Sequence, residues 1–244
     1  MNPSRDTSAH RKFRARRQDR FAQGPVKGRR AIVGVIANSA ALQQACRLRQ
    51  PPDFFELRLD ALQPDLAQVE GALPQLNAPL ILTARHPAED GVHNLPASAR
   101  RQLLTQFLEH AAWLDLELRS AKILHSLGKE ICRPKIGLIL SHHDLRDTPS
   151  LPRLREQLQR ARDGGADIFK IATRTDTPAQ LDRLLAFFSE NSARFPIAAM
   201  GFGALGPASR RQLFRLGSVL NYASIGPALL PGQLSLAQLR SLVR

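Results

Sequence analysis

Cysteine is scarce in this 244-residue chain, which holds only Cys46 and Cys132. Two thiols cannot build a disulfide scaffold, and these two lack the spacing of a zinc site. We therefore expect reduced, buried thiols in a cytoplasmic protein with no structural metal. Long apolar runs are also absent, so no stretch of about eighteen apolar residues predicts a membrane-spanning helix. The 43% apolar content is nevertheless enough for the core of one domain.

Acidic residues are few in the first thirty positions, where ten Lys or Arg residues accompany only Asp6 and Asp19. Residues 1–30 thus carry +8 of the net charge of +14. They show almost no apolar periodicity, which predicts a disordered basic arm. A solvated tail, a transit peptide and a nucleic-acid tether are the open interpretations of this arm. Aromatic residues make up only 5% of the chain, so recognition of nucleic-acid bases by stacking is not indicated.

After the arm, short apolar runs alternate with longer amphipathic ones, and residues 31–244 are predicted to form one domain. The alternation is typical of parallel βα units, and eight such units predict a (β/α)₈ TIM barrel. No G-x-G-x-x-G motif follows the first run, which disfavours a dinucleotide-binding fold. Asp147-Thr148-Pro149 and Asp176-Thr177-Pro178 are expected helix starts, and Gly164-Gly165 an expected helix end. The expected strands are Ala31–Ala37, Asp53–Leu59, Pro79–Ala84, Trp113–Leu118, Lys135–Ser141, Ala166–Ala172, Phe195–Gly201 and Asn221–Ile225.

Lysine is rare as well, because only six of the 35 basic residues are Lys. Lys170 stands inside the apolar strand Ala166–Ala172, where an ammonium is costly to bury. A desolvated lysine can act as an amine nucleophile, whereas arginine stays protonated. An imine-forming lysine is therefore one interpretation, and a lysine that pairs with Asp or Glu at the barrel mouth is the other.

Polar side chains lie at the carboxyl ends of the expected strands, where barrel active sites are built. His143 supplies a base of near-neutral pKa, and because His142 is adjacent on the strand, only one of the two can face the site. Glu89, Asp115 or Glu117 could orient the imidazole. The arginines among these residues indicate an anionic substrate, since guanidinium groups bind carboxylates at two points; they are Arg58, Arg85 and Arg210.

The pattern of these residues resembles type I 3-dehydroquinate dehydratase over residues 31–244. The most specific match is Asp115-Leu116-Glu117-Leu118, followed after nineteen residues by Leu138-Ile139-Leu140-Ser141-His142-His143-Asp144. The other matches, in chain order, are Glu56-Leu57-Arg58-Leu59-Asp60, Thr83-Ala84-Arg85 with Glu89, Gly165–Ala172, Met200-Gly201, Ser209-Arg210 and Pro231-Gly232-Gln233.

The resemblance implies a homodimeric hydro-lyase of the shikimate pathway that needs no metal or organic cofactor. Lys170 would form an imine with the C3 ketone of 3-dehydroquinate, and His143, oriented by Glu89, would remove a proton from C2. His143 would then help water to leave from C1, giving 3-dehydroshikimate. Arg210 would bind the substrate carboxylate, and Gln233 would close over the ring. The ring hydroxyls would be bound by Glu56, Arg58 and Arg85.

The sequence departs from the family pattern at two places. Leu229-Leu230 replaces the Ser-Ala that commonly precedes the Pro-Gly-Gln segment, and Gly34 stands where some relatives have a polar residue on the first strand. Both departures remove hydrogen bonds to substrate, so a weakly active relative is one alternative. A class I aldolase is the other catalytic alternative, although Gly201–Gly206 is a weak match to a phosphate-binding loop. A non-catalytic barrel that binds nucleic acid or a partner protein through its basic arm is the third alternative.

Overall fold

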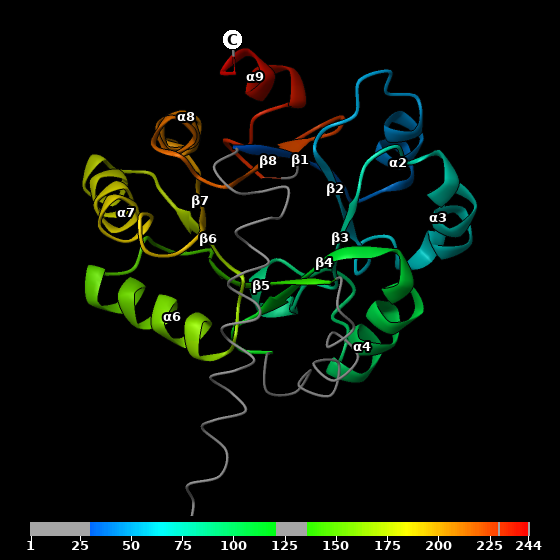
Figure 1. Cartoon of the computed structure of the whole chain (residues 1–244), viewed down its shortest axis with the longest axis horizontal. Coiled ribbons are helices and arrows are strands. Elements are labelled where there is room, and N and C mark those ends of the chain that lie inside the picture. Colours follow the sequence, from blue (N-terminus) through cyan, green and yellow to red (C-terminus); the bar gives the residue numbers. More distant parts are fainter. Residues whose placement is uncertain (1–29, 121–135, 229, 244) are drawn as a thin grey trace, which may run out of the picture.

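The computed structural model describes residues 30–120, 136–228 and 230–243, and it shows eight parallel strands. The hydrogen-bonded order is β7-β6-β5-β4-β3-β2-β1-β8, and each strand is parallel to its neighbours in this order. The (β/α)₈ barrel predicted from the alternation is therefore confirmed (Figure 1). The strands are β1 (Ala31–Ile36), β2 (Phe54–Arg58), β3 (Leu80–Thr83), β4 (Ala111–Glu117), β5 (Gly137–Asp144), β6 (Ile168–Arg174), β7 (Ile197–Phe202) and β8 (Leu220–Ser224).

Helices surround the strands in Figure 1 and cover the outer surface of the barrel. Apolar side chains from alternate strand positions pack against them, for example Phe169 and Ile171 of β6 against Phe187 of the helix that follows. The helices are α2 (Ser39–Cys46), α3 (Leu66–Ala72), α4 (Ala97–Gln106), α6 (Leu151–Asp163), α7 (Pro178–Asn191), α8 (Gly206–Leu216) and α9 (Leu236–Ser241). Short 3₁₀ turns lie at Gln63–Asp65, Leu73–Gln75, Pro87–Glu89 and Leu108–His110.

The junction between β7 and β8 closes the barrel differently from the other strand pairs. The backbone N–H of Val219 donates to the carbonyl of Ile197 over 3.1 Å at the amino ends of these strands. At the carboxyl ends, Arg210 of α8 donates to the carbonyls of Gly201 and Tyr222 over 3.0 and 2.9 Å. A side chain thus joins the two strands where the described residues show no ladder between them.

The inward-facing positions fill the barrel in layers. Apolar residues occupy its lower part, among them Val33, Ile81, Trp113, Ile139 and Ile168. Towards the carboxyl ends the same face becomes charged, with Glu56, Asp115 and Lys170 all buried. Alternate residues of each strand therefore face the barrel interior, where they form a packed apolar core near the amino ends and a polar site near the carboxyl ends.

The predicted element boundaries are largely confirmed, with one wrong helix start. Thr177 caps α7 with a capping box, and Gly164 ends α6, as expected. Asp147-Thr148-Pro149 does not begin a helix, because the Thr148 hydroxyl donates to the Arg174 carbonyl over 2.7 Å instead of capping a backbone N–H. Helix α6 begins at Leu151, with Pro152 in its first turn.

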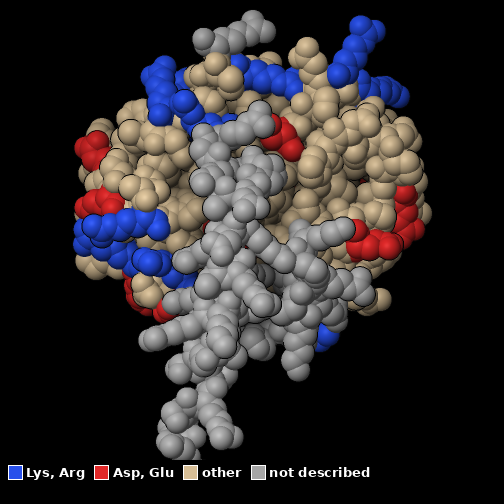
Figure 2. All heavy atoms as spheres, in the orientation of Figure 1, with Lys and Arg blue, Asp and Glu red and all other residues tan. Residues whose placement is uncertain are grey.

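The basic arm lies outside the described residues except for Arg30, so its predicted disorder stays a prediction. Cys46 is a free, half-buried thiol, and Cys132 falls outside the described part. Basic side chains gather along the upper edge and the left flank of the described surface in Figure 2. Among the described helices, none is long and apolar enough to cross a bilayer.

Two glycines provide a matched test of the packing. A Cβ at Gly137 of β5 would overlap the Trp113 ring, whereas one at Gly71 of α3 would meet nothing within 4 Å. We expect Gly137→Ala to lower the free energy of unfolding by about 1–3 kcal/mol through overpacking. Gly71→Ala should raise it by about 0.5–1 kcal/mol, because alanine is the better helix former. Chemical denaturation of both variants checks this, and equal effects would contradict the structure.

Candidate active site

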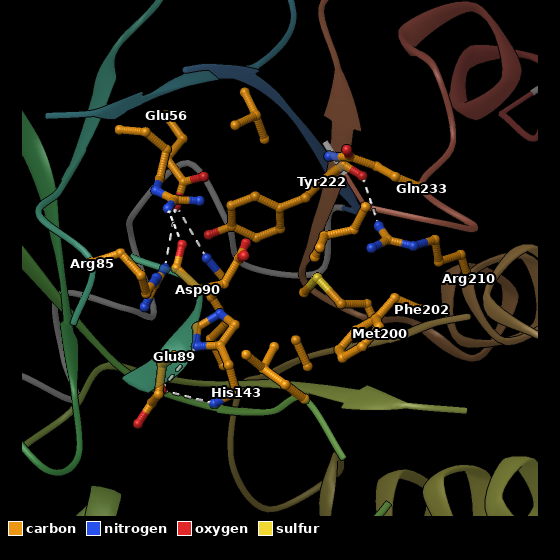
Figure 3. A pocket seen from close by; sticks show the side chains of 16 residues that line it. Glu56, Arg85, Glu89, Asp90, His143, Met200, Phe202, Arg210, Tyr222 and Gln233 are labelled. Carbon is orange, nitrogen blue, oxygen red and sulfur yellow. Dashed lines mark hydrogen bonds and ion pairs between the residues drawn. The ribbon is translucent and has the colours of Figure 1, made fainter. Parts of the chain in front are cut away.

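A pocket of about 580 Å³, counting the part open to solvent, lies at the carboxyl ends of the strands. All eight residues predicted from the sequence to form the site line it, and they come from six strands or the segments that follow them (Figure 3). They are Glu56, Arg58, Arg85, Glu89, His143, Lys170, Arg210 and Gln233.

Lys170 lies at the inner face of β6, because Ile168 and Ala172 face inward with it while Phe169 and Ile171 face the helices. Its side chain is 3% exposed. Nζ is 2.7 Å from Asp115 Oδ2 and 3.1 Å from Glu56 Oε1, so both carboxylates accept hydrogen bonds from the ammonium. The lysine is thus paired, as one interpretation expected, and it also lies in the wall of the pocket.

Arg85 shares Asp115 with this lysine and contacts a third carboxylate, Glu117. Its guanidinium contacts Asp115 Oδ2 at 3.0 Å and Glu117 Oε1 at 3.2 Å. Burial by itself raises the pKa of Asp115, but Arg85 and Lys170 outweigh it and hold that pKa below its usual range. Asp115 therefore remains ionised, and it fixes both cations.

His143 of β5, the strand next to β6, forms a second pair with Glu89. His143 Nδ1 is 3.1 Å from Glu89 Oε2, and the His143 backbone N–H donates to the same oxygen over 2.9 Å. Burial, then Arg85 and Lys170, lower the pKa of His143 well below its usual value, so its ring is neutral. A neutral ring whose Nδ1–H is held by Glu89 presents Nε2 as a base.

Glu89 is the carboxylate that orients His143, because Asp115 and Glu117 are already committed to Arg85. Burial raises the pKa of Glu89 to about 7, against the effect of Arg85. Arg119, which is half exposed, brings its Nε within 2.9 Å of Glu89 Oε1 and also favours the ionised form. The Glu89 carboxyl therefore changes its protonation state close to neutral pH.

The three arginines differ in what they already bind. Arg58 holds Asp60 at two points, with N···O distances of 3.0 and 2.9 Å, and Arg85 is held by Asp115 and Glu117. Among the described residues no carboxylate pairs with Arg210, which donates only to backbone carbonyls. Burial lowers its pKa to about 10. A buried guanidinium without a counter-charge is a site for an anion.

Three comparisons with known proteins agree on the family. The family model described as Type I 3-dehydroquinase matches residues 32–244. The chain belongs to the type I 3-dehydroquinase family. It is 31% identical over 218 residues to a 3-dehydroquinate dehydratase of Thermococcus gammatolerans, covering 87% of this chain and 97% of that protein.

Solved structures of 3-dehydroquinate dehydratases share the fold. The Aquifex aeolicus structure superposes with a TM-score of 0.72 and 27% identity, covering 87% of this chain and 96% of that one. The Geobacillus kaustophilus structure gives a TM-score of 0.78 at 22% identity, covering 88% and 90%. The latter supports the barrel fold alone.

One predicted departure from the family pattern falls on the wrong residue. A Cβ at Gly34 would point towards Ile225 and Pro52, so Gly34 does not face the pocket. Val35 is the residue of β1 that lines it, since the inward positions of this strand alternate. The first strand therefore offers substrate an apolar surface in place of a hydrogen bond.

The segment before Gln233 lies against the loop after β7. The backbone N–H of Gly203 donates to the Pro231 carbonyl over 2.8 Å, and the Gln233 N–H donates to the Leu230 carbonyl over 3.2 Å. Gly232 has a φ of 80° and packs against Gly203 and Gly206, a conformation and a closeness that other residues do not tolerate. Leu230 lines the pocket, and Leu229 lies outside the described residues.

Sequence reasoning did not single out several lining residues, namely Asp90, Leu145, Phe202 and Tyr222. Tyr222 is the only tyrosine of the chain. It stands two residues after Leu220 on β8, so the strand period would have placed it on the inner face.

The Arg119–Glu89 contact gives a prediction about charge. Arg119→Leu removes a cation that favours the ionised carboxylate, so the pKa of Glu89 should rise above about 7. Titration of ¹³C-labelled glutamate side chains by NMR measures it, with the Glu89 resonance assigned by its loss in Glu89→Gln. Arg155→Leu, which removes an exposed partner of Glu190, is the matched control. An unchanged or lowered pKa in Arg119→Leu would contradict the contact.

Proposed function

We propose that this chain removes water from 3-dehydroquinate to give 3-dehydroshikimate through an imine on Lys170. The observation that carries the proposal is the arrangement in one pocket of a buried lysine, a neutral histidine and an arginine without a counter-charge. These are the three groups that the reaction needs: an electron sink, a base and a carboxylate anchor. Family membership supports the same reaction.

The chemistry begins when the Lys170 ammonium gives up a proton and the free amine attacks the C3 ketone. The adduct takes a proton back and loses water, which gives a protonated imine. His143 then takes a proton from C2, and the electron pair moves into the imine as an enamine. As imidazolium, His143 returns that proton to the C1 hydroxyl, which leaves as water. Hydrolysis of the imine releases the product and restores the lysine. These steps consume no oxidant, reductant or metal.

Substrate binding is divided among the remaining lining residues. Arg210 binds the carboxylate, because its guanidinium is buried and has no acidic partner in the described chain. Glu56, Arg58 and Arg85 contact the ring hydroxyls from the opposite wall, and Gln233 covers the bound ring. Val35 and Leu230 supply apolar contact only, so their side chains offer the substrate no hydrogen bond.

The proposal includes a cytoplasmic homodimer, as the resemblance to the family implies. The basic arm is placed outside the catalytic machinery, because the eight proposed site residues all come from residues 56–233.

Borohydride reduction with substrate present tests the imine. The parent chain should give a substrate-derived mass adduct on the Lys170 peptide and the ultraviolet enone band of the product. Lys170→Ala should abolish both. Lys170→Arg, which keeps a cation between Asp115 and Glu56 but cannot form an imine, should fold and also give neither. An adduct accompanied by release of an aldehyde would identify an aldolase instead, and no adduct from folded parent would refute the proposal.

The role of Arg210 has its own test. Arg210→Lys keeps the charge and loses the two-point geometry, so KM should rise about 10–100-fold, equivalent to about 1.4–2.7 kcal/mol. Steady-state kinetics with 3-dehydroquinate and with its carboxamide analogue measure this. The carboxamide should bind the parent weakly and the variant equally weakly. The same KM ratio for both compounds would show that Arg210 does not bind the carboxylate.

A further inference from the structure

Tyr222 of β8 lies beside Nζ of Lys170, and the proposed reaction gives it no role. Its ring centroid is 3.9 Å from Lys170 Nζ, so the ring face lies against the ammonium as a cation–π contact. In Figure 3 the hydroxyl end of Tyr222 points away from Arg210 and Gln233, towards the wall that holds Glu56 and Arg85.

The Tyr222 hydroxyl is buried and has no hydrogen-bond partner among the described residues. Such a group is costly to keep, because it has lost its bonds to water and gained none. Burial, and then the charges of Glu56 and Asp115, raise the pKa of Tyr222 well above its usual value. The hydroxyl therefore stays protonated, and it is available as a donor.

Lys170 has fewer N–H donors as an imine than as an ammonium, and this frees an acceptor for the Tyr222 hydroxyl. The free ammonium has three N–H groups, and it donates to both Asp115 and Glu56. A protonated imine has one. The single N–H can keep the shorter contact with Asp115, and the longer contact with Glu56 is then lost.

Glu56 loses a close charged donor in that state, because the Thr83 hydroxyl and the proposed contact to a substrate hydroxyl are both neutral donors. Its Oε1 retains the Thr83 hydroxyl at 2.9 Å, and Arg85 Nη2 is 3.8 Å away. Asp115 by comparison keeps Arg85 and the Ser141 hydroxyl. A buried carboxylate that loses a charged donor raises the energy of the state in which the loss occurs.

We propose that Tyr222 is a positioning residue whose hydroxyl takes over the hydrogen bond to Glu56 when Lys170 becomes an imine. Its ring meanwhile remains against the nitrogen and faces a cation in both states. This inference rests on the proposed function, because it needs the imine. It explains why an unpartnered hydroxyl is present in the free enzyme.

The test separates this role from a structural one by kinetics and stability together. Tyr222→Phe keeps the ring and removes only the hydroxyl, so its kcat should fall about tenfold while KM changes less than twofold. The melting temperature of the free variant should be unchanged or higher, since an unpartnered hydroxyl is removed. Ser218→Ala is the matched control, because the Ser218 hydroxyl is buried and bonded to the Ala199 N–H at 3.1 Å, away from the pocket. It should lower the melting temperature and leave kcat unchanged.

A double-mutant cycle identifies the partner of the hydroxyl. In a Glu56→Gln background the further effect of Tyr222→Phe on kcat should shrink below twofold, because the charged acceptor is gone. A full tenfold effect in that background would overturn the assignment to Glu56.

The remaining outcomes are equally distinct. A lower melting temperature with unchanged kcat would make Tyr222 structural, and a raised KM with unchanged kcat would make it a contact to the bound substrate; either overturns the proposal. Borohydride trapping on Lys170 of the parent is run alongside. If no adduct forms there, the proposed function fails and this inference with it, whereas an adduct with an unchanged Tyr222→Phe kcat overturns this inference alone.

Discussion

Charge balance inside the barrel mouth is the constraint on which the rest of the site depends. Four buried cations meet four buried carboxylates there, each within ion-pair distance of a partner. Removing an ion from water costs several kcal/mol, and only close, hydrogen-bonded pairing offsets that cost. The cations are Arg58, Arg85, Arg100 and Lys170, and the carboxylates are Glu56, Asp60, Asp115 and Glu117.

Two charged groups stand outside this balance, and both belong to the proposed chemistry. Arg210 has no carboxylate in the described chain, so an anionic substrate completes its pairing. Because the same guanidinium joins β7 to β8, the group proposed to anchor the substrate also closes the barrel. Glu89 is the second exception, because burial raises its pKa to about 7 and its carboxyl therefore exchanges protons near neutral pH.

Lys170 could be predicted from the sequence because an arginine-rich composition made a lysine in an apolar strand conspicuous. The barrel could be predicted because eight apolar runs alternate with amphipathic ones. The partner of each charge could not, since Glu89, Asp115 and Glu117 are equivalent as letters, and only the fold decides which of them meets Arg85 and which meets His143. The inward residue of β1 was misplaced by one position, from Val35 to Gly34, and on a strand that error exchanges the two faces. Tyr222 was passed over because its ring is typical of a core strand, and nothing in the sequence marks its hydroxyl as unpartnered.

The apolar residues of the pocket also affect the interactions between its charged groups. Val35, Leu230, Met200 and Phe202 line the pocket with apolar side chains, which under the proposed function give a hydroxylated ring few hydrogen bonds and weaken its ground-state binding. They also place apolar surface beside Lys170 and His143, and charges act more strongly on their neighbours in apolar surroundings than in water. Weaker ground-state binding raises KM. Stronger electric fields at the reacting atoms help to maintain kcat, so KM changes more than kcat. In the proposed function, these apolar residues therefore lower the affinity of the site for its substrate while the lysine, histidine and glutamate stay in place.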